Sequence, residues 1–334
     1  MKKDTKTRLF IFTLFTISFA ILLGGCSGSS NDNIIRPEGA TVSRRFPVGN
    51  FTAIDIGPFA DVAFRHANER SIVVEAAENL IDFANADVVQ GVLITGINPG
   101  SGIGIEFGGR RPQITIYAPS NSITGVTLDG GVTMTDWAPI SAHNFFIETR
   151  GSSQANLDLI LTGNLDIITR NFSDVELNFS EVGDLTIDTS GSSNVTIASR
   201  PTIAGNLDII AGNFSDVNLE LATAEDVTIN ATGSSRVTLL GSAQSLNIEA
   251  GNFAQVVASN LPVRDAVVFL SGSSRVGVYA TEALSGFATS FSQLQYRGMG
   301  ENVHTVRTSG SATVTQEPGN FHREVNQPTQ NQRQ

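Results

Sequence analysis

"RNFSDVELNF" (residues 170–179) and "GNFSDVNLEL" (residues 212–221) decide the fold of this chain. Both contain Asn-Phe-Ser-Asp-Val, and both continue as alternating apolar and polar residues. Related turn motifs, which read "GSS", "NFS", "NFA", "SFS" or "GSA", follow one another at steps of 18 to 22 residues. A repeat of this length indicates a solenoid. The motifs begin at Gly151, Asn171, Gly191, Asn213, Gly233, Asn252, Gly272, Ser290 and Gly310.

The residues around each turn have the pattern of β-strands. After Asn171, the apolar residues Val175, Leu177 and Phe179 alternate with polar ones, which is typical of a strand with one buried face. Two short strands cannot bury their own apolar face, but stacked copies bury it together and confine free strand edges to the two ends. The sequence therefore predicts an all-β fold, a β-helix or β-solenoid over residues 120–316, after a less regular β-rich part or cap over residues 44–119.

The turn residues predict backbone geometry and a packing pattern. Gly and Asn, which hold nearly every first position, tolerate a positive φ. The second position alternates between Ser and Phe. We expect Phe to point inward, where it would fill the space beside the small Ser of each neighbouring turn. In the alternative, Phe points outward and forms an apolar stripe that is a candidate binding surface. The phenylalanines are Phe172, Phe214, Phe253 and Phe291.

The two ends of the chain read as segments outside the fold. Residues 1–25 combine a basic start with the apolar run Leu9–Leu23 and two glycines, the pattern of a secretory signal. The ending Leu-Gly-Gly-Cys looks like a bacterial lipobox, so we predict lipidation of Cys26, the single cysteine. Residues 26–43 are predicted to be a flexible tether, and residues 317–334 a disordered tail.

Charge excludes several classes of function. The chain has a net charge of −11, and removal of residues 1–25, which carry four bases and one acid, leaves −11 − 3 = −14. A strongly acidic chain is unsuited to nucleic acid or to unaided binding of anionic membranes. Residues 26–334 contain no lysine, which excludes Schiff-base chemistry and lysine general bases.

Catalytic and metal-binding motifs are not recognisable in the sequence. His66, His143, His304 and His322 have no metal-ligand spacing and no cysteine partner. No Gly-x-Ser-x-Gly elbow occurs. The glycine-rich stretch Asn98–Pro112 reads as a mobile loop rather than a phosphate site. We therefore predict no catalytic residue, no metal and no cofactor, and a protein that is not an enzyme.

An outward polar ladder is the predicted binding surface. Residues three and five positions past each turn are mostly polar and recur with the repeat. Asp174 and Asp216 would lie two turns apart, about 9.6 Å, which is near the upper limit for the carboxylates of an inverting glycosidase. We prefer a solvated ladder, and the enzyme remains the alternative. The predicted ladder residues are Gln154, Asp174, Glu176, Asn194, Asp216, Arg236 and Arg275.

"RRFPVGNFTAIDIGPFADVAFRHANERSIVVEAAENLIDFANADVVQGVLITG" (residues 44–96) resembles the opening of the putative autotransporter adhesin head GIN-domain family, and so do the later strands with "GSS" turns. The resemblance spans roughly Phe46 to Thr315. It implies a bacterial lipoprotein with a right-handed β-helical region, and it provides no catalytic residues.

These observations favour a non-enzymatic protein of the bacterial cell envelope. We expect it to be lipid-anchored to the outer membrane, on the periplasmic or the surface side, and to act as an adhesin or scaffold. Its expected partner is a surface polymer, either a polysaccharide or an envelope protein. Two alternatives remain, a polysaccharide-active β-helix lyase or glycosidase and a purely structural spacer.

Overall fold

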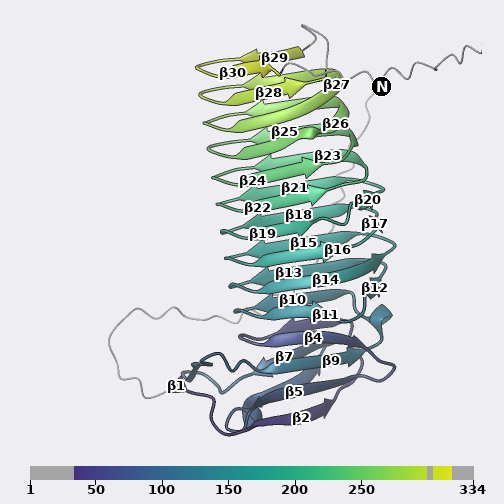
Figure 1. The fold of residues 1–334 in the computed structure, drawn as a ribbon, viewed down its shortest axis with the longest axis vertical. Helices are drawn as coiled ribbons and strands as arrows, with labels where there is room; N and C mark the ends of the chain where they lie inside the picture. The colour runs from purple at the N-terminus through teal and green to yellow at the C-terminus, as the bar shows by residue number, and fades with distance from the viewer. Residues whose placement is uncertain (1–33, 299–303, 318–334) are drawn as a thin grey trace, which may run out of the picture.

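The computed structural model describes residues 34–298 and 304–317 and shows a β-solenoid (Figure 1). Successive coils stack through parallel strand pairs. For example, β13 (Phe145–Arg150) pairs with β15 (Leu165–Arg170), which pairs with β18 (Leu185–Ser190). Ile147, Ile167 and Ile187 are therefore directly stacked, and the solenoid predicted from the repeat is confirmed.

Each coil has two strands joined by the tight turn, and the stacked strands form two sheets. We name them the pre-turn sheet and the post-turn sheet, and we name the stack of tight turns between them the turn edge. The pre-turn sheet continues from β18 through β21 (Leu207–Gly212), β23 (Ala224–Ala231), β25 (Ala243–Ala250) and β29 (His304–Thr308). The post-turn sheet contains β14 (Gln154–Leu161), β16 (Asp174–Asn178), β19 (Asn194–Ile197), β22 (Asp216–Glu220), β24 (Arg236–Leu240), β28 (Gln293–Arg297) and β30 (Thr313–Gln316).

Two long strands belong to both sheets. β26 (Gln255–Leu270) pairs with β24 near its start and with β25 near its end. β27 (Arg275–Ala288) follows β26 with two register shifts and then pairs with β28 and β29. In earlier coils the far connection is irregular and contains only short strands, namely β12 (Ile140–Ala142), β17 (Glu181–Val182) and β20 (Thr202–Ile203).

The core lies between the two sheets as columns of stacked aliphatic side chains. Ile167 and Ile187 from the pre-turn sheet, and Leu177 and Ile197 from the post-turn sheet, are completely buried. Each such side chain contributes about 1.5–3 kcal/mol through burial. The alternation of buried and exposed residues along every strand places the polar columns on the outer faces.

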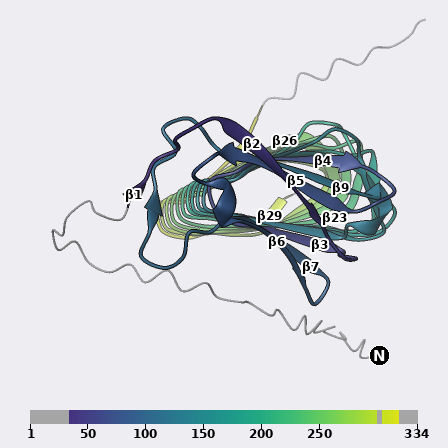
Figure 2. The ribbon, with the colours of Figure 1, turned by 90° about the horizontal axis from the view of Figure 1, so that it is seen from below.

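The N-terminal part both starts the solenoid and caps it. One coil contains β3 (Ala53–Ile56) and β4 (Asp61–His66), and it lies between a coil of β7 (Val92–Ile97) and β9 (Gln113–Ala118) and a coil of β10 (Gly125–Asp129) and β11 (Thr133–Asp136). Antiparallel strands cover the open end (Figure 2), which removes a free edge. These antiparallel strands are β2 (Thr41–Pro47), β5 (Ser71–Ala77) and β6 (Ala84–Val89). The N-terminal part also contains two 3₁₀ turns, η1 (Ile81–Phe83) and η2 (Ser120–Ser122).

The folded part begins earlier than the sequence suggested. β1 (Ile34–Ile35) and the start of β2 lie inside residues 26–43, the range predicted as a tether. β1 pairs with β8 (Gly104–Ile105) within the glycine-rich loop, so part of that loop is held rather than free. The predicted signal peptide, Cys26 and residues 318–334 lie outside the described residues. Within the described part, no helix is long and apolar enough to cross a membrane.

Candidate functional site

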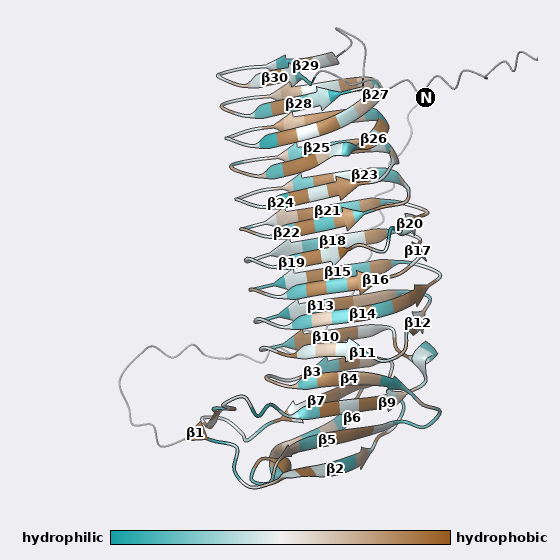
Figure 3. Cartoon of the chain, viewed as in Figure 1, coloured by the Kyte–Doolittle hydropathy of each residue, from teal (hydrophilic) through white to brown (hydrophobic). Residues whose placement is uncertain are grey.

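The predicted polar ladder exists, and it runs along the outer face of the post-turn sheet. Strand pairing sets Gln154 beside Asp174, Asp174 beside Asn194 and Asn194 beside Asp216. Figure 3 shows polar segments recurring along the stacked strands. The column then continues through Arg236, Gln255, Arg275, Gln293 and Thr313, and it extends in the other direction through Thr133, Asp61 and Gln113.

Hydrogen bonds within the ladder occupy its carboxylates. Asn194 Nδ2 donates to Asp174 Oδ1 at 2.7 Å, and Asn218 Nδ2 donates to Asp216 Oδ1 at 3.3 Å. Asn194 therefore separates Asp174 from Asp216, and each carboxylate has its own amide partner. This arrangement presents donors and acceptors at intervals of about 4.8 Å.

A second polar column lies beside the first on the same face. It places Asn156 next to Glu176, Glu176 next to Thr196 and Thr196 next to Asn218. Towards the C-terminus this column becomes smaller and less polar, with Thr238, Val257, Gly277, Gln295 and Thr315.

The turn edge has the predicted backbone, but its phenylalanines point outward and correct our expectation. The first position has a positive φ in every turn of the series, from 50° at Asn213 to 77° at Gly191. Phe172, Phe214, Phe253 and Phe291 are between 68% and 71% exposed. The reason is that both residues at the tip of the turn, Asn171 and Phe172, are exposed, and the nearest buried positions on either side are Thr169 and Ser173.

The inward corner position is the third residue of each turn. Ser153, Ser173 and Ser193 are completely buried there, and each Oγ donates to the carbonyl three residues earlier at 2.7–2.9 Å. Only Ser or Ala occurs at this position, and this restriction to small residues is the signal in the sequence for an inward corner beside an outward Phe. The other corner residues are Ser215, Ser235, Ala254, Ser274, Ser292 and Ala312.

Stacked turns also hydrogen-bond to one another, and the direction of these bonds reverses midway. Up to the turn at Gly191, the second residue donates to the following turn, as in Phe172 N to Gly191 O at 2.8 Å. From the turn at Asn252 onward it donates to the preceding turn, as in Phe253 N to Gly233 O at 2.9 Å. The second residue has a positive φ in "GSS" and "NFS" turns up to Phe214 but not after it. The reversal therefore accompanies a flipped peptide between the first two residues of the turn.

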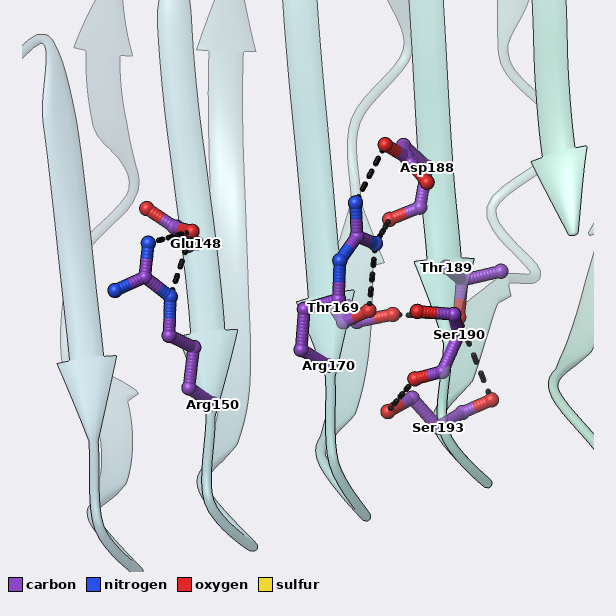
Figure 4. Close-up of polar contacts among 8 residues, drawn as sticks. All are labelled: Glu148, Arg150, Thr169, Arg170, Asp188, Thr189, Ser190 and Ser193. Atoms are coloured by element: carbon purple, nitrogen blue, oxygen red, sulfur yellow. Dashed lines mark hydrogen bonds and ion pairs between the residues drawn. The ribbon is translucent and has the colours of Figure 1, made fainter. Parts of the chain in front are cut away.

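Charged side chains on the pre-turn sheet pair with one another (Figure 4). Arg150 Nε donates to Glu148 Oε1 at 2.8 Å, and Arg170 contacts both the side chain and the carbonyl of Asp188 at 2.5 and 2.7 Å. Burial raises the pKa of nearby Asp55 above its usual value, with Asp129 adding to the rise, Arg150 opposing it and Glu148 adding to it. These four charged groups satisfy one another.

Among the described residues, Asp136 at the end of β11 is the carboxyl whose pKa departs most from its usual value. Burial raises its pKa to about 6, the hydrogen bond from Asp158 N at 3.1 Å opposes the rise, and the charge of Asp158 adds to it. Beside it, the Arg65 guanidinium lies 3.6 Å from the ring centroid of Trp137, a cation–π contact.

Histidines and acidic groups do not form a metal centre in the part of the chain that the structure describes. His66 Nδ1 accepts from Ser120 N at 3.1 Å, and His143 Nδ1 lies 3.1 Å from Thr162 Oγ1. Both contacts join neighbouring segments of the fold, which gives these residues a structural role. His322 lies outside the described residues.

Two further apolar features are exposed. Phe59, in the tight turn between β3 and β4, contacts Phe107 of the glycine-rich loop with ring centroids 5.7 Å apart. These rings line an open apolar cavity of about 170 Å³ with Pro58, Ile97 and Ile103. On the pre-turn sheet, the rings of Phe269 and Phe287 stack at 6.1 Å.

Comparisons with known proteins yield one family and several solved structures. The family model described as "Putative auto-transporter adhesin, head GIN domain" matches residues 50–201 and 197–300. A putative adhesin from Parabacteroides merdae is 16% identical, with 85% of this chain and 99% of that one covered and a TM-score of 0.46. A putative adhesin from Parabacteroides distasonis is 17% identical, with 85% and 100% covered and a TM-score of 0.49. A putative lipid binding protein from the same species is 14% identical, with 85% and 99% covered and a TM-score of 0.41. No curated protein matches the chain.

Proposed function

Because the chain belongs to the family of putative auto-transporter adhesin head GIN domains, we propose that it is an adhesin-like rod that binds a linear surface polymer without cleaving it. The observation that carries the proposal is the continuous polar ladder on the post-turn sheet, from Gln113 to Thr313. A repetitive face suits a repetitive ligand, because many weak contacts at a fixed spacing add up to useful avidity.

A polysaccharide is the preferred polymer. The ladder offers amides, hydroxyls and isolated charges, which are the groups that hydrogen-bond sugar hydroxyls. The pre-turn sheet is less suitable, because one of its outer columns includes Ile210, Phe269 and Phe287, which interrupt the series of polar groups. The amide beside each ladder aspartate supports binding rather than acid–base chemistry, since a general acid needs a tuned carboxyl that is free to act.

The test is an array of envelope and host polysaccharides probed with the mature chain and two matched variants. Thr196→Arg with Asn218→Arg places two bulky cations on the second polar column. Thr228→Arg with Asn247→Arg places the same residues on the exposed face of the pre-turn sheet. We expect the first pair to weaken binding by about tenfold, the factor that corresponds to losing a few weak contacts, and the second pair to leave binding unchanged.

Catalysis is tested with the same polysaccharides. Replacing Asp174, Glu176 and Asp216 with Asn, Gln and Asn should change binding modestly and leave the fold intact. Released product that disappears in this triple variant would establish the lyase or glycosidase alternative. Neither binding nor cleavage would leave the protein as a structural spacer.

We also propose that the rod is held at the cell envelope by a lipid on Cys26, with residues 27–33 as the tether to the folded part that begins at Ile34. The Leu-Gly-Gly-Cys ending supports lipidation, and Ser27 after the cysteine is compatible with outer-membrane sorting. This arrangement would hold the solenoid and its ladder next to the polymers of the envelope.

A further inference from the structure

The turn edge presents four large apolar side chains to solvent at regular intervals. Phe172, Phe214, Phe253 and Phe291 protrude from every second turn, and the turns between them carry Ser at the same position. Such a series is uncommon on a protein that exists alone in water, because exposed apolar groups in a row mark interaction sites. We propose that two copies of this chain associate along this edge as antiparallel rods.

The shape of the edge is complementary to itself only in certain registers. When two rods lie antiparallel and centred between the turns at Asn213 and Gly233, each phenylalanine of one copy meets a serine turn of the other. A shift by a single turn would instead set phenylalanine against phenylalanine. The facing pairs are Phe172 with Ser273, Phe214 with Ser234, Phe253 with Ser192 and Phe291 with Ser152.

The charges beside the edge select the same register. The ladder column that adjoins the turns carries acids in its first half and bases in its second half. In the centred arrangement Asp174 faces Arg275 and Asp216 faces Arg236, while amides face amides. A shift by two turns leaves a single Asp–Arg pair, and parallel rods at the same level would set like charges together.

The arginines of the proposed ion pairs are available for contact with a second copy. Arg236 and Arg275 are exposed, and neither forms an ion pair among residues 34–298 and 304–317. The turn conformation also changes at the centre of the proposed pairing, because the second residue has a positive φ up to Phe214 and not from Ser234 onward. A two-fold interface sets each half of the edge against the other half of the partner copy.

The area is adequate for a specific contact. Four phenylalanines, each about seven-tenths exposed, would bury roughly 400–700 Å² per copy, given 150–250 Å² for a whole aromatic side chain. The adjoining polar column brings the total near the ~800 Å² per partner of a standard interface. A phenylalanine at the turn edge is covered by another aromatic ring within the chain itself, because Phe59 lies in a tight turn and contacts Phe107.

Two-fold symmetry about an axis normal to the sheets keeps both post-turn sheets on one side of the dimer. The two polar ladders then lie next to each other and form one wider face. This inference does not depend on polymer binding, but it predicts that a bound polymer would meet two ladders of opposite direction.

Complementary charge variants test the pairing. The mature chain (residues 26–334) with Cys26→Ser, to remove the proposed lipid, is studied by sedimentation velocity. One variant carries Asp174→Arg and Asp216→Arg, and the other carries Arg236→Asp and Arg275→Asp. We expect the parent to dimerise. Each variant alone should associate more weakly than the parent, by about tenfold or by a larger factor. An equimolar mixture of the two variants should recover the parent's affinity as a heterodimer.

The aromatic contribution is tested separately. Replacing the four edge phenylalanines by Ser should abolish the dimer, whereas Phe269→Ser with Phe287→Ser, which are exposed on the pre-turn sheet, should not. Circular dichroism verifies that each variant is folded. A parent chain that sediments as a monomer at every concentration would overturn the proposal. So would charge variants that associate separately as well as the parent does, or a mixture that fails to associate. Polysaccharide arrays read out the proposed function independently, so that failure of one proposal is distinguishable from failure of the other.

Discussion

The same substitution at two buried corner serines should have opposite effects on stability. Ser193 Oγ donates to Ser190 O at 2.9 Å and accepts from Ser173 N at 3.2 Å. Ser193→Ala removes both bonds and leaves the buried Ser173 N–H without an acceptor. Leaving a buried donor unpaired costs about 1–3 kcal/mol, so we expect a loss of free energy of unfolding in that range.

Ser215→Ala should be neutral or stabilising. The buried Ser215 Oγ has no hydrogen-bond partner in the described part of the chain, and the carbonyl of Gly212, three residues earlier, accepts from Ser215 N at 3.3 Å. Removing an unsatisfied hydroxyl recovers its desolvation cost, on the order of 1 kcal/mol. The chain itself uses Ala at this position in one turn, where Ala254 is completely buried and its N–H donates to Gly251 O.

Urea unfolding followed by circular dichroism measures both variants. We expect a difference of about 2–4 kcal/mol between them in the extrapolated free energy of unfolding, with equal slopes. Ala254→Ser is the reciprocal control and should destabilise, since Ala254 is completely buried and the added hydroxyl would lose its hydration there. Equal effects of Ser193→Ala and Ser215→Ala would refute the argument that hydrogen-bond satisfaction, rather than size, distinguishes these two corner serines.

Three further changes follow from the structure. Gly191→Val should destabilise by more than about 1 kcal/mol, because φ is 77° and the new Cβ would lie 2.9 Å from Asn171 N; an unchanged melting temperature would contradict this. Cys26→Ser should move the protein from the membrane to the soluble fraction, and a mutant that still pellets after a high-salt wash would exclude the lipid anchor. Asp136→Asn should stabilise at pH 8, because burial raises the pKa of Asp136 to about 6 in the folded state, above the usual value of an aspartate, and the buried charge is therefore unfavourable. The gain should shrink as the pH falls through 6 and vanish below about 4, as measured by urea unfolding of both proteins across this range; a gain that does not depend on pH would show that the charge is not responsible.

Much of the solenoid could be predicted because its information is local. A step of about 20 residues between turns, with alternating side chains, determines which residues stack, and the ladder from Gln154 to Thr313 has the register expected from it. Two extra residues between Gly191 and Asn213 leave this register intact because they fall in the far connection, one between Ile197 and Thr202 and one between Ile203 and Leu207, away from the tight turns. The sequence also carries a signal for the outward direction of Phe172, because only Ser or Ala occupies the inward corner that follows the second residue of each turn.

Other features were decided only by the tertiary structure. The coil of β3 and β4 is inserted between two coils that follow it in the sequence, and antiparallel strands close that end. The repeat pattern also does not predict two other features. They are the pairing of Arg170 with Asp188 and the reversal of the turn hydrogen bonds midway along the turn edge. The physical reason is that a sequence period reports the side-chain face and the spacing of each residue. The order in which coils stack, and the orientation of individual peptides and long side chains, depend on contacts between segments whose sequences carry no common period.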